Sequence, residues 1–266
     1  HILPDVDDGA ENLKEAVVEP FKDLSLNELR VFWLIFQHST SSRIQISSRL
    51  KLTRAAVTLI VKKLISMELI RETGQTQPKS GRGRRQVLLE MHPNAGCVVT
   101  VHFALHYYSI ALVNLAGAIL SKTTHQIDHY DQPRKTLELT AKSIQSMMGE
   151  TSSSPVLGVS VALPGIVDEK RGMAVERTLV GWHDYSVQEH LQALIGLPVF
   201  VANDVKLDTI GEFYFGAGRG VRDLVCLWLE DGIGAGVVMN GQLIRGVSSS
   251  AGEIGFNPFF TPNPSI

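Results

Sequence analysis

Apolar segments of strand length alternate with segments of helical periodicity between residues 97 and 239 of this 266-residue chain. Such alternation is typical of an α/β domain, in which helices pack on a sheet. The predicted strands are residues 98–101, 109–113, 118–123, 156–161, 198–201, 224–229 and 235–239, and the predicted helices are 136–148, 187–195 and 205–213. The first three strands are joined by short turns, which predicts a meander.

The part before residue 93 has a different pattern. Ser25 precedes Glu28 by three residues, a capping-box spacing that starts a helix. A second short helix is predicted over residues 44–50, and Thr53 is a suitable N-cap for a third. The apolar residues of that third helix recur on one face: Val57, Ile60, Val61, Leu64 and Ile65. Three short helices with a tight turn between the last two favour a helix-turn-helix.

A predicted β-hairpin follows these helices. Its strands are residues 69–73 and 86–90, and its tip, residues 74–85, is rich in Gly, Ser and Arg. This pattern is typical of a winged helix, whose basic wing reaches the minor groove while the third helix enters the major groove. The predicted DNA contacts are Arg54, Ala55, Thr58 and Lys62 on the helix and Lys79, Arg82, Arg84 and Arg85 in the wing.

Charge supports this interpretation. The chain has a net charge of −2, but residues 22–92 carry 13 Lys and Arg against five Asp and Glu, a net charge of +8. A compact basic segment in an acidic chain indicates a polyanionic partner. The alternatives are a solvated charged face and, for the third helix, a plain core helix. An amphipathic helix is also predicted over residues 10–22, either packing on this domain or serving dimerisation.

Two further features concern the compartment. Cys97 and Cys226 are the two cysteines, which suits a reducing cytoplasm and provides neither a disulfide framework nor a Cys-rich zinc site. No run of 18 apolar residues occurs, so no membrane partner is expected.

Residues 158–168, which contain Pro164, Gly165, Val167 and Asp168, resemble the Pro-Gly-x-Val-Asp segment of the ROK family (repressors, open reading frames, kinases). The other similar segments are Leu179–Trp182, Leu197–Asp204 with Phe215–Gly218 after it, residues 232–246, and Ala251–Gly255. The resemblance covers nearly all of residues 24–255. It implies an actin-like (ribonuclease H-like), two-lobed domain of the sugar-kinase type, with a ligand cleft between the lobes.

Members of this family with a winged helix in front are sugar-responsive repressors of the NagC/XylR type. The resemblance therefore implies an N-terminal arm or helix over residues 1–21, a winged helix-turn-helix domain over 22–92 and a kinase-like domain over 93–266. Its first lobe would cover residues 93–200, and residues 201–266 would form an incomplete second lobe. An incomplete lobe is expected to expose apolar surface that other segments or a partner subunit cover.

The phosphate-binding residues of the family's kinases are replaced in this chain. Their Asp-x-Gly-Gly-Thr-Lys segment aligns with residues 102–107, so that His102 takes the place of the Asp and Ala104 and Leu105 replace the two Gly. Their Gly-Thr-Gly aligns with Glu230, Asp231 and Gly232, which puts two carboxylates near the triphosphate. We therefore expect no enzyme activity, no catalytic residue and no cofactor, although Asp204 matches the family's catalytic base.

A sugar site is expected to be partly kept. The resemblance assigns effector binding to Gly165, Asn203, Asp204 and Glu253, whose amide and carboxylates suit a polyol. Two departures affect specificity: Phe256 replaces a family His and Thr178 replaces a family Asn. The alternative is that Asn203 and Asp204 only cap the next helix.

No metal is expected. The family's zinc-binding Cys segment is absent, and the histidines near the degenerate hairpin lack Cys partners: His92, His102, His106 and His125.

Together these observations predict a sequence-specific transcriptional regulator, a repressor of carbohydrate metabolism genes. Its expected partners are a double-stranded DNA operator, a sugar or sugar-phosphate effector, and further copies of itself in a homodimer or homotetramer. Two alternatives stay open, namely an active ROK sugar kinase and a ligand-free, oligomerising DNA-binding protein.

Overall fold

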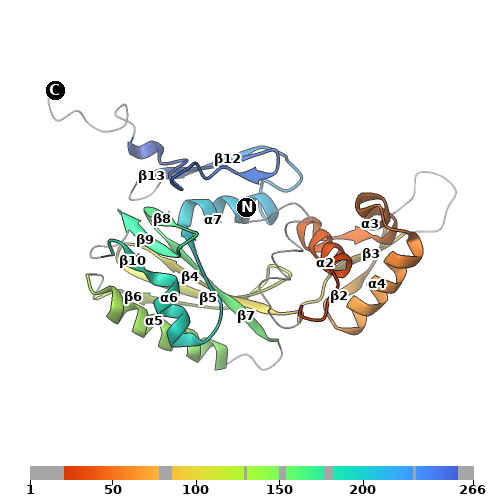
Figure 1. The fold of residues 1–266 in the computed structure, drawn as a ribbon, viewed down its shortest axis with the longest axis horizontal. Helices are drawn as coiled ribbons and strands as arrows, with labels where there is room; N and C mark the ends of the chain where they lie inside the picture. Colours follow the sequence, from red (N-terminus) through yellow and green to blue (C-terminus); the bar gives the residue numbers. More distant parts are fainter. Residues whose placement is uncertain are drawn as a thin grey trace.

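The computed structural model describes residues 21–77, 86–128, 131–149, 154–176, 182–229 and 232–256 (Figure 1). The predicted helix over residues 10–22, the wing residues Lys79, Arg82, Arg84 and Arg85, and Leu179, Glu230 and Asp231 fall wholly or mainly outside these described residues.

Residues 21–77 and 86–91 form a unit of three helices and a small sheet, here called the helical unit. Its elements are α2 (Leu26–His38), β1 (Ser41–Ser42), α3 (Arg43–Leu50), α4 (Arg54–Ser66), β2 (Ile70–Gln77) and β3 (Gln86–Met91), with strand order β1-β3-β2. The predicted helices and hairpin are present, although β2 extends beyond residue 73 to Gln77.

The predicted helix caps are also present. Ser25 accepts a hydrogen bond from the backbone N–H of Glu28 at 3.4 Å, and Glu28 Oε2 accepts one from the Ser25 N–H at 2.7 Å. Thr53 Oγ1 accepts from the Ala56 N–H at 3.2 Å and begins α4. These side chains satisfy N–H groups that have no partner inside the helix. The apolar faces of α2, α3 and α4 then meet in one core with Leu69, Ile70 and Leu89.

The predicted α/β part contains a five-stranded sheet of order β11-β7-β4-β5-β6. Its strands are β4 (Cys97–Phe103), β5 (Tyr107–Asn114), β6 (Ile119–Gln126), β7 (Val156–Leu163) and β11 (Val199–Asn203). The meander β4-β5-β6 is antiparallel, whereas β7 pairs parallel to β4 and β11 pairs parallel to β7. Parallel pairs require crossover connections, and helices supply them here.

Three helices accompany this sheet. In Figure 1, α5 (Pro133–Gly149) and α6 (Val187–Ile195) lie on one side of it and α7 (Asp204–Tyr214) on the other. Leu137, Ile144 and Leu191 from α5 and α6 pack with strand residues in one buried cluster. Parallel strands end at the same edge of a sheet, so β7 and β11 bring the turns that follow them close together.

Two small sheets complete the fold. The first has order β10-β9-β8, with β8 (Ile166–Asp168), β9 (Met173–Glu176) and β10 (Tyr185–Ser186). The second has order β12-β13-β14, with β12 (Leu224–Leu229), β13 (Ile233–Met239) and β14 (Gln242–Leu243), followed by the 3₁₀ turn η1 (Ile254–Phe256). Figure 1 shows α7 between the five-stranded sheet and the β12–β13 hairpin.

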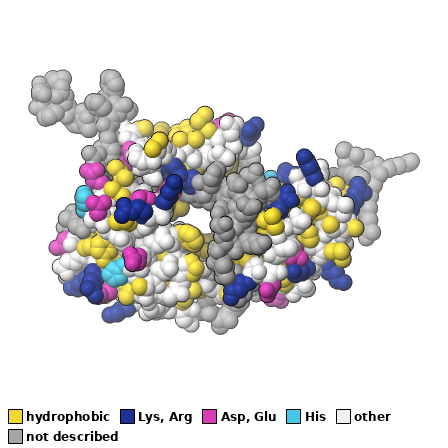
Figure 2. All heavy atoms as spheres, in the orientation of Figure 1, with side chains coloured by type: hydrophobic (Ala, Val, Ile, Leu, Met, Phe, Trp, Pro, Cys, Tyr) yellow, Lys and Arg dark blue, Asp and Glu magenta, His cyan; other side chains and the backbone are white. Residues whose placement is uncertain are grey.

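One face of β12 is apolar and exposed. Val225, Leu227 and Leu229 alternate along the strand and are 61%, 64% and 71% exposed. Figure 2 shows apolar side chains along this outer part of the molecule. Exposed apolar surface was expected in this part of the chain.

Candidate functional site

The junction between β11 and α7 holds Asn203 and Asp204. Asn203 is 4% exposed and is the N-cap of α7, because its Oδ1 accepts a hydrogen bond from the Lys206 N–H at 3.1 Å. Its Nδ2 donates to the Gly165 carbonyl and to Asp204 Oδ1, both at 3.0 Å. The capping alternative thus describes Asn203 well. Its two amide hydrogens are engaged within the protein, so this residue positions its neighbours.

Asp204 is the more available of the two residues. Its Oδ1 accepts from the Val205 N–H at 2.8 Å and from Asn203, and both of these bonds leave Oδ2 available. Burial raises the pKa of this carboxyl to about 6. The hydrogen bond from the Val205 N–H and the charge of His102 oppose this rise, whereas the charges of Asp208 and Glu253 add to it. A carboxyl group accepts hydrogen bonds from hydroxyls when it is ionised, and it can donate one when it is protonated.

Gly165 and Glu253 join this junction from two other segments. Gly165 has a φ of +79°, a conformation that suits glycine, and this turn after β7 directs its carbonyl toward Asn203. Glu253 lies in the segment between β14 and η1, close enough to affect the pKa values of Asp204 and Lys206. The structure therefore brings the four predicted effector residues together, while their role stays a prediction.

Lys206 is a member of this site that the sequence did not indicate. It is 2% exposed, and its Nζ donates to the backbone carbonyl of Ser249. Burial lowers the pKa of this ammonium, whereas the charges of Glu169 and Glu253 favour its ionised form. Lysine is seldom fully buried without partners, and here the partners come from two distant segments.

A second cation holds the same segment. Arg245 Nε pairs with Glu169 Oε2 at 2.8 Å, and the two side chains are 19% and 14% exposed. The other oxygen of Glu169, Oε1, is buried and has no hydrogen-bond partner among the described residues. Lys206 and Arg245 thus fasten residues 245–253, which include Glu253, to α7 and to the β8–β9 turn.

The turn between β4 and β5 contains the residues that were aligned above with the first phosphate hairpin of the kinases. It is closed by a hydrogen bond from the Ala104 N–H to the Tyr107 carbonyl at 2.8 Å. Leu105 in this turn is 39% exposed. No group of three or more His, Cys, Asp or Glu side chains among the described residues is arranged to hold a metal ion.

The candidate DNA-binding surface is the exposed face of α4. Arg54, Ala55, Thr58 and Lys62 are all exposed, at spacings that place them along one side of the helix. The Thr58 hydroxyl donates to the Arg54 carbonyl at 2.8 Å, so this hydroxyl is engaged within the helix. Figure 2 shows several Lys and Arg side chains over the helical unit, with apolar side chains between them.

Three other cations of the helical unit are paired. Lys63 pairs with Glu28 at 2.8 Å, Arg43 with Glu72 at 2.9 Å, and Arg71 with Glu90 at 2.8 Å. Arg54 and Lys62 make no ion pair in the part of the chain that the structure describes. The available positive charge on α4 is therefore on the predicted contact face.

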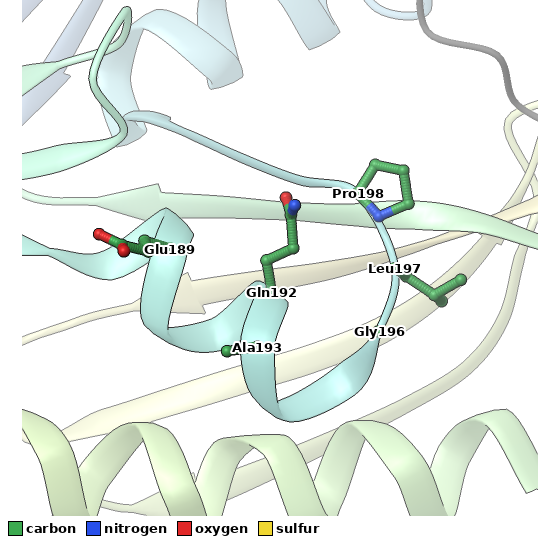
Figure 3. A pocket seen from close by; sticks show the side chains of 6 residues that line it. All are labelled: Glu189, Gln192, Ala193, Gly196, Leu197 and Pro198. Carbon is green, nitrogen blue, oxygen red and sulfur yellow. The ribbon is translucent and has the colours of Figure 1, made fainter.

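A surface pocket lies at the turn between α6 and β11 (Figure 3). It is lined by Glu189, Gln192, Ala193, Gly196, Leu197 and Pro198. This turn precedes β11, whereas Asp204 follows it, so the pocket and the candidate effector site lie at opposite ends of one strand.

Among the described residues, no helix is both long and apolar enough to span a bilayer.

Comparisons with known proteins bear on both the helical unit and the α/β part of the chain. The chain is 28% identical over 232 residues to the xylose repressor of Caldicellulosiruptor bescii, covering 86% of this chain and 58% of the repressor. It is 29% identical over 236 residues to the DNA-binding transcriptional dual regulator NagC of Escherichia coli K12, covering 86% and 56%. The chain thus spans a little more than half the length of these curated relatives.

Two solved structures of ROK family proteins are also similar to this chain. A ROK family transcriptional regulator, a homologue of the E. coli Mlc protein, superposes with a TM-score of 0.67 at 29% identity, covering 86% of this chain and 58% of that one. A ROK family glucokinase from Streptomyces griseus superposes with a TM-score of 0.52 at 28% identity, covering 60% and 50%. Residues 98–263 match the ROK family, and the chain belongs to that family.

Proposed function

We propose that this chain is the DNA-binding and effector-sensing part of a sugar-responsive transcriptional repressor that acts in the cytoplasm. The observation that carries the proposal is the exposed face of α4, where Arg54 and Lys62 have no ion-pair partner among the described residues. The similarity to NagC and the xylose repressors extends over 86% of the chain and supports this assignment.

The helical unit would bind DNA as a winged helix-turn-helix. In that arrangement α4 enters the major groove, with Arg54, Ala55 and Thr58 near base edges and Lys62 near the backbone. The β2–β3 hairpin would be the wing, and its residues Lys79, Arg82, Arg84 and Arg85 would contact the minor groove and the phosphates. A homodimer or homotetramer would bind an operator with two-fold symmetry.

The kinase-like part would bind the effector at Asp204 and Glu253. The two carboxylates can accept hydrogen bonds from several hydroxyls of one sugar, and Asn203 and Gly165 hold Asp204 in place. The cations beside them, Lys206 and Arg245, already contact Ser249 and Glu169. This distribution favours an uncharged sugar over a sugar phosphate.

Phosphoryl transfer is the competing function, because the glucokinase shares the fold. Transfer from ATP needs backbone that can approach the phosphates and a bound metal. Ala104 and Leu105 stand where the kinases have glycines, so we expect no ATP-dependent phosphorylation of glucose, xylose or N-acetylglucosamine. Measurable ATP turnover with one of these sugars would favour the kinase.

A selection experiment tests the DNA-binding half directly. The protein would be incubated with a random duplex library, and the bound DNA would be amplified and sequenced. We expect enrichment of a motif with two-fold symmetry, bound more weakly by Arg54→Ala. Recovery of unenriched DNA with equal affinity for all duplexes would contradict sequence-specific binding.

A thermal-shift screen tests the sensing half. We expect D-xylose, N-acetylglucosamine or another neutral sugar to raise the melting temperature, and Asp204→Asn to abolish that rise. Stabilisation by sugar phosphates alone would contradict the neutral-sugar assignment, and stabilisation that survives in Asp204→Asn would place the sugar elsewhere.

A further inference from the structure

Helix α7 has its two ends at two different functional regions. The helix begins at Asp204, in the candidate effector site, and Asn203 is its N-cap. Its C-cap is Phe215, eleven residues further on, at a distance of about 16 Å for helical rise. A short helix of three turns moves as one body, so a shift at one end displaces the other.

The C-terminal end of α7 contacts the last turn of α2 in the helical unit. The rings of Phe36 and Phe215 meet edge to face, with centroids 6.0 Å apart and planes at 79°. Gln37 and Tyr214 share a side-chain hydrogen bond. Just beyond α7, Arg219 Nη2 donates to Ser39 Oγ at 2.8 Å.

This contact is small and lies at the edge of both units. Phe215 remains 47% exposed, and its ring also lies over Gly117 in the β5–β6 turn, where an added Cβ would come within 3.2 Å of the ring. A half-exposed aromatic contact of this kind can be made or broken without opening either core. It therefore suits an interface with two arrangements.

The contact is connected to the candidate DNA-binding surface through α2. Phe36 stacks on Trp33, with ring centroids 5.3 Å apart, and Trp33 is 8% exposed. The buried face of α2, including Leu34 and Ile35, packs in the same core as Val57 and Val61 of α4. A tilt of α2 is thus transmitted to the helix that carries Arg54.

We propose that α7 couples the effector site to the DNA-binding surface, through the contact of its C-terminal end with the last turn of α2. The proposal rests on the proposed function. An effector that binds at Asp204 better in one position of α7 shifts the population of that position, and DNA affinity changes with it. Figure 1 shows α7 extending from beside β8 toward α2.

A double-mutant cycle on operator affinity tests the coupling without any effector. Asp204→Asn perturbs one end of α7 and Phe215→Ala the other, and the operator is the duplex selected by the unsubstituted protein. Effects of distant, independent sites multiply within about twofold. We expect the double variant to depart from the product of the single effects by more than about threefold. Multiplicative effects would overturn the proposal.

Matched variants control for loss of structure. Arg222→Ala removes a similar exposed contact near the same end of α7, because Arg222 bonds Asn240 at 2.9 Å and not α2. Its effect should multiply with that of Asp204→Asn. Tyr214→Phe removes one hydroxyl from the contact and keeps the ring. It is the milder substitute if Phe215→Ala folds poorly, and it should show the same kind of non-additivity with Asp204→Asn.

Hydrogen exchange separates failure of this proposal from failure of the proposed function. It is measured on the full chain without DNA or sugar, comparing Asp204→Asn with the unsubstituted protein. We expect altered protection in residues 36–38 of α2 and in its C-cap Ser39, and unaltered protection in α3. Unaltered protection in both would overturn the coupling, even in a protein that selects an operator. Altered protection in a protein that selects no operator would support the coupling while the proposed function fails.

The effector response is the last readout, with D-xylose and N-acetylglucosamine as probes. Allosteric coupling typically changes affinity about 5–150-fold. In Phe215→Ala we expect the sugar to stabilise the protein as before, while its effect on operator affinity falls below about twofold, within the range of uncoupled sites. A full response in this variant would overturn the proposal.

Discussion

The Asn203 side chain joins the end of one strand to the turn after another, because its Nδ2 donates to the Gly165 carbonyl at 3.0 Å while its Oδ1 caps α7. β11 and β7 are parallel neighbours, so both segments reach the same edge of the sheet. This single buried amide therefore sets the position of Asp204 relative to the β7–β8 turn.

Replacement of Asn203 by Ala should lower the free energy of unfolding by about 1–3 kcal/mol, through loss of the N-cap and of a buried hydrogen bond. Asn203→Asp keeps a capping oxygen, but when ionised it loses the donors to both Gly165 and Asp204 and places a second carboxylate beside Asp204, so it should be less stable than the parent although the cap remains. Urea unfolding measures both variants. An Ala variant as stable as the parent would contradict the structural role.

The stability of the protein should depend on pH through Asp204. Its pKa is raised to about 6 by burial, so between its ordinary value near 4 and pH 6 the folded state binds more protons than the unfolded state. The free energy of unfolding should therefore fall as pH rises from 4 to 6, by up to about 3 kcal/mol from this group, and then level off.

Asp204→Asn isolates this effect, since the amide keeps the shape and removes the titration. The free energy of unfolding of the variant should therefore rise relative to that of the parent as pH increases to about 6, and the difference should stay constant above that pH. Urea unfolding at pH 4.5, 5.5 and 7 measures the difference. A constant difference across this range would mean that the carboxyl does not titrate there.

Local signals predicted much of the helical unit. Ser25 with Glu28, and Thr53, act on N–H groups only a few residues away, so their capping could be read from spacing. The order β11-β7-β4 could not be read in this way, because it depends on crossovers between distant segments. β8, β9 and β10 are too short to show a period, and sequence reasoning missed them.

In the candidate site, too, some residues could be predicted from the sequence, whereas others depend on contacts between distant segments. The resemblance placed Asp204 and Glu253 together, but Lys206 follows Asp204 closely in a helix where an exposed lysine would be ordinary. Its burial arises from Ser249, 43 residues away, and from Glu169. Phe36 lies in the last turn of α2, and its contact with Phe215 depends on how the helical unit packs against α7.

Lys206→Met should destabilise the protein by about 3 kcal/mol, because methionine fills a similar volume but leaves Glu169 and Glu253 without this cation. Lys62→Met on the exposed face of α4 is the control and should change stability by less than about 0.5 kcal/mol. Thermal or urea unfolding measures both. Equal stability of the two variants would mean that the buried ammonium does not neutralise these carboxylates.

The wing residues give a prediction about salt dependence. Replacing Arg82, Arg84 and Arg85 together by Ala should weaken binding to all duplexes and reduce the slope of log affinity against log salt by up to about three. Anisotropy titrations at several salt concentrations measure the slope. A slope equal to that of the parent protein would contradict the assignment of these arginines to phosphate contacts.

Lys62 and Lys63 are adjacent on α4, yet they should differ in their effect on DNA binding. Lys62 is exposed on the contact face, whereas Lys63 is held by Glu28 at 2.8 Å. Lys62→Ala should therefore weaken binding to all duplexes and reduce the salt slope by about one, as expected for one lost phosphate contact. Lys63→Ala should leave the slope unchanged, because its charge is already paired with Glu28, and should lower stability by about 1 kcal/mol, because this ion pair is partly buried. Anisotropy titrations and urea unfolding of the two variants make the comparison. A larger loss of slope in Lys63→Ala than in Lys62→Ala would mean that another face of α4 meets the DNA.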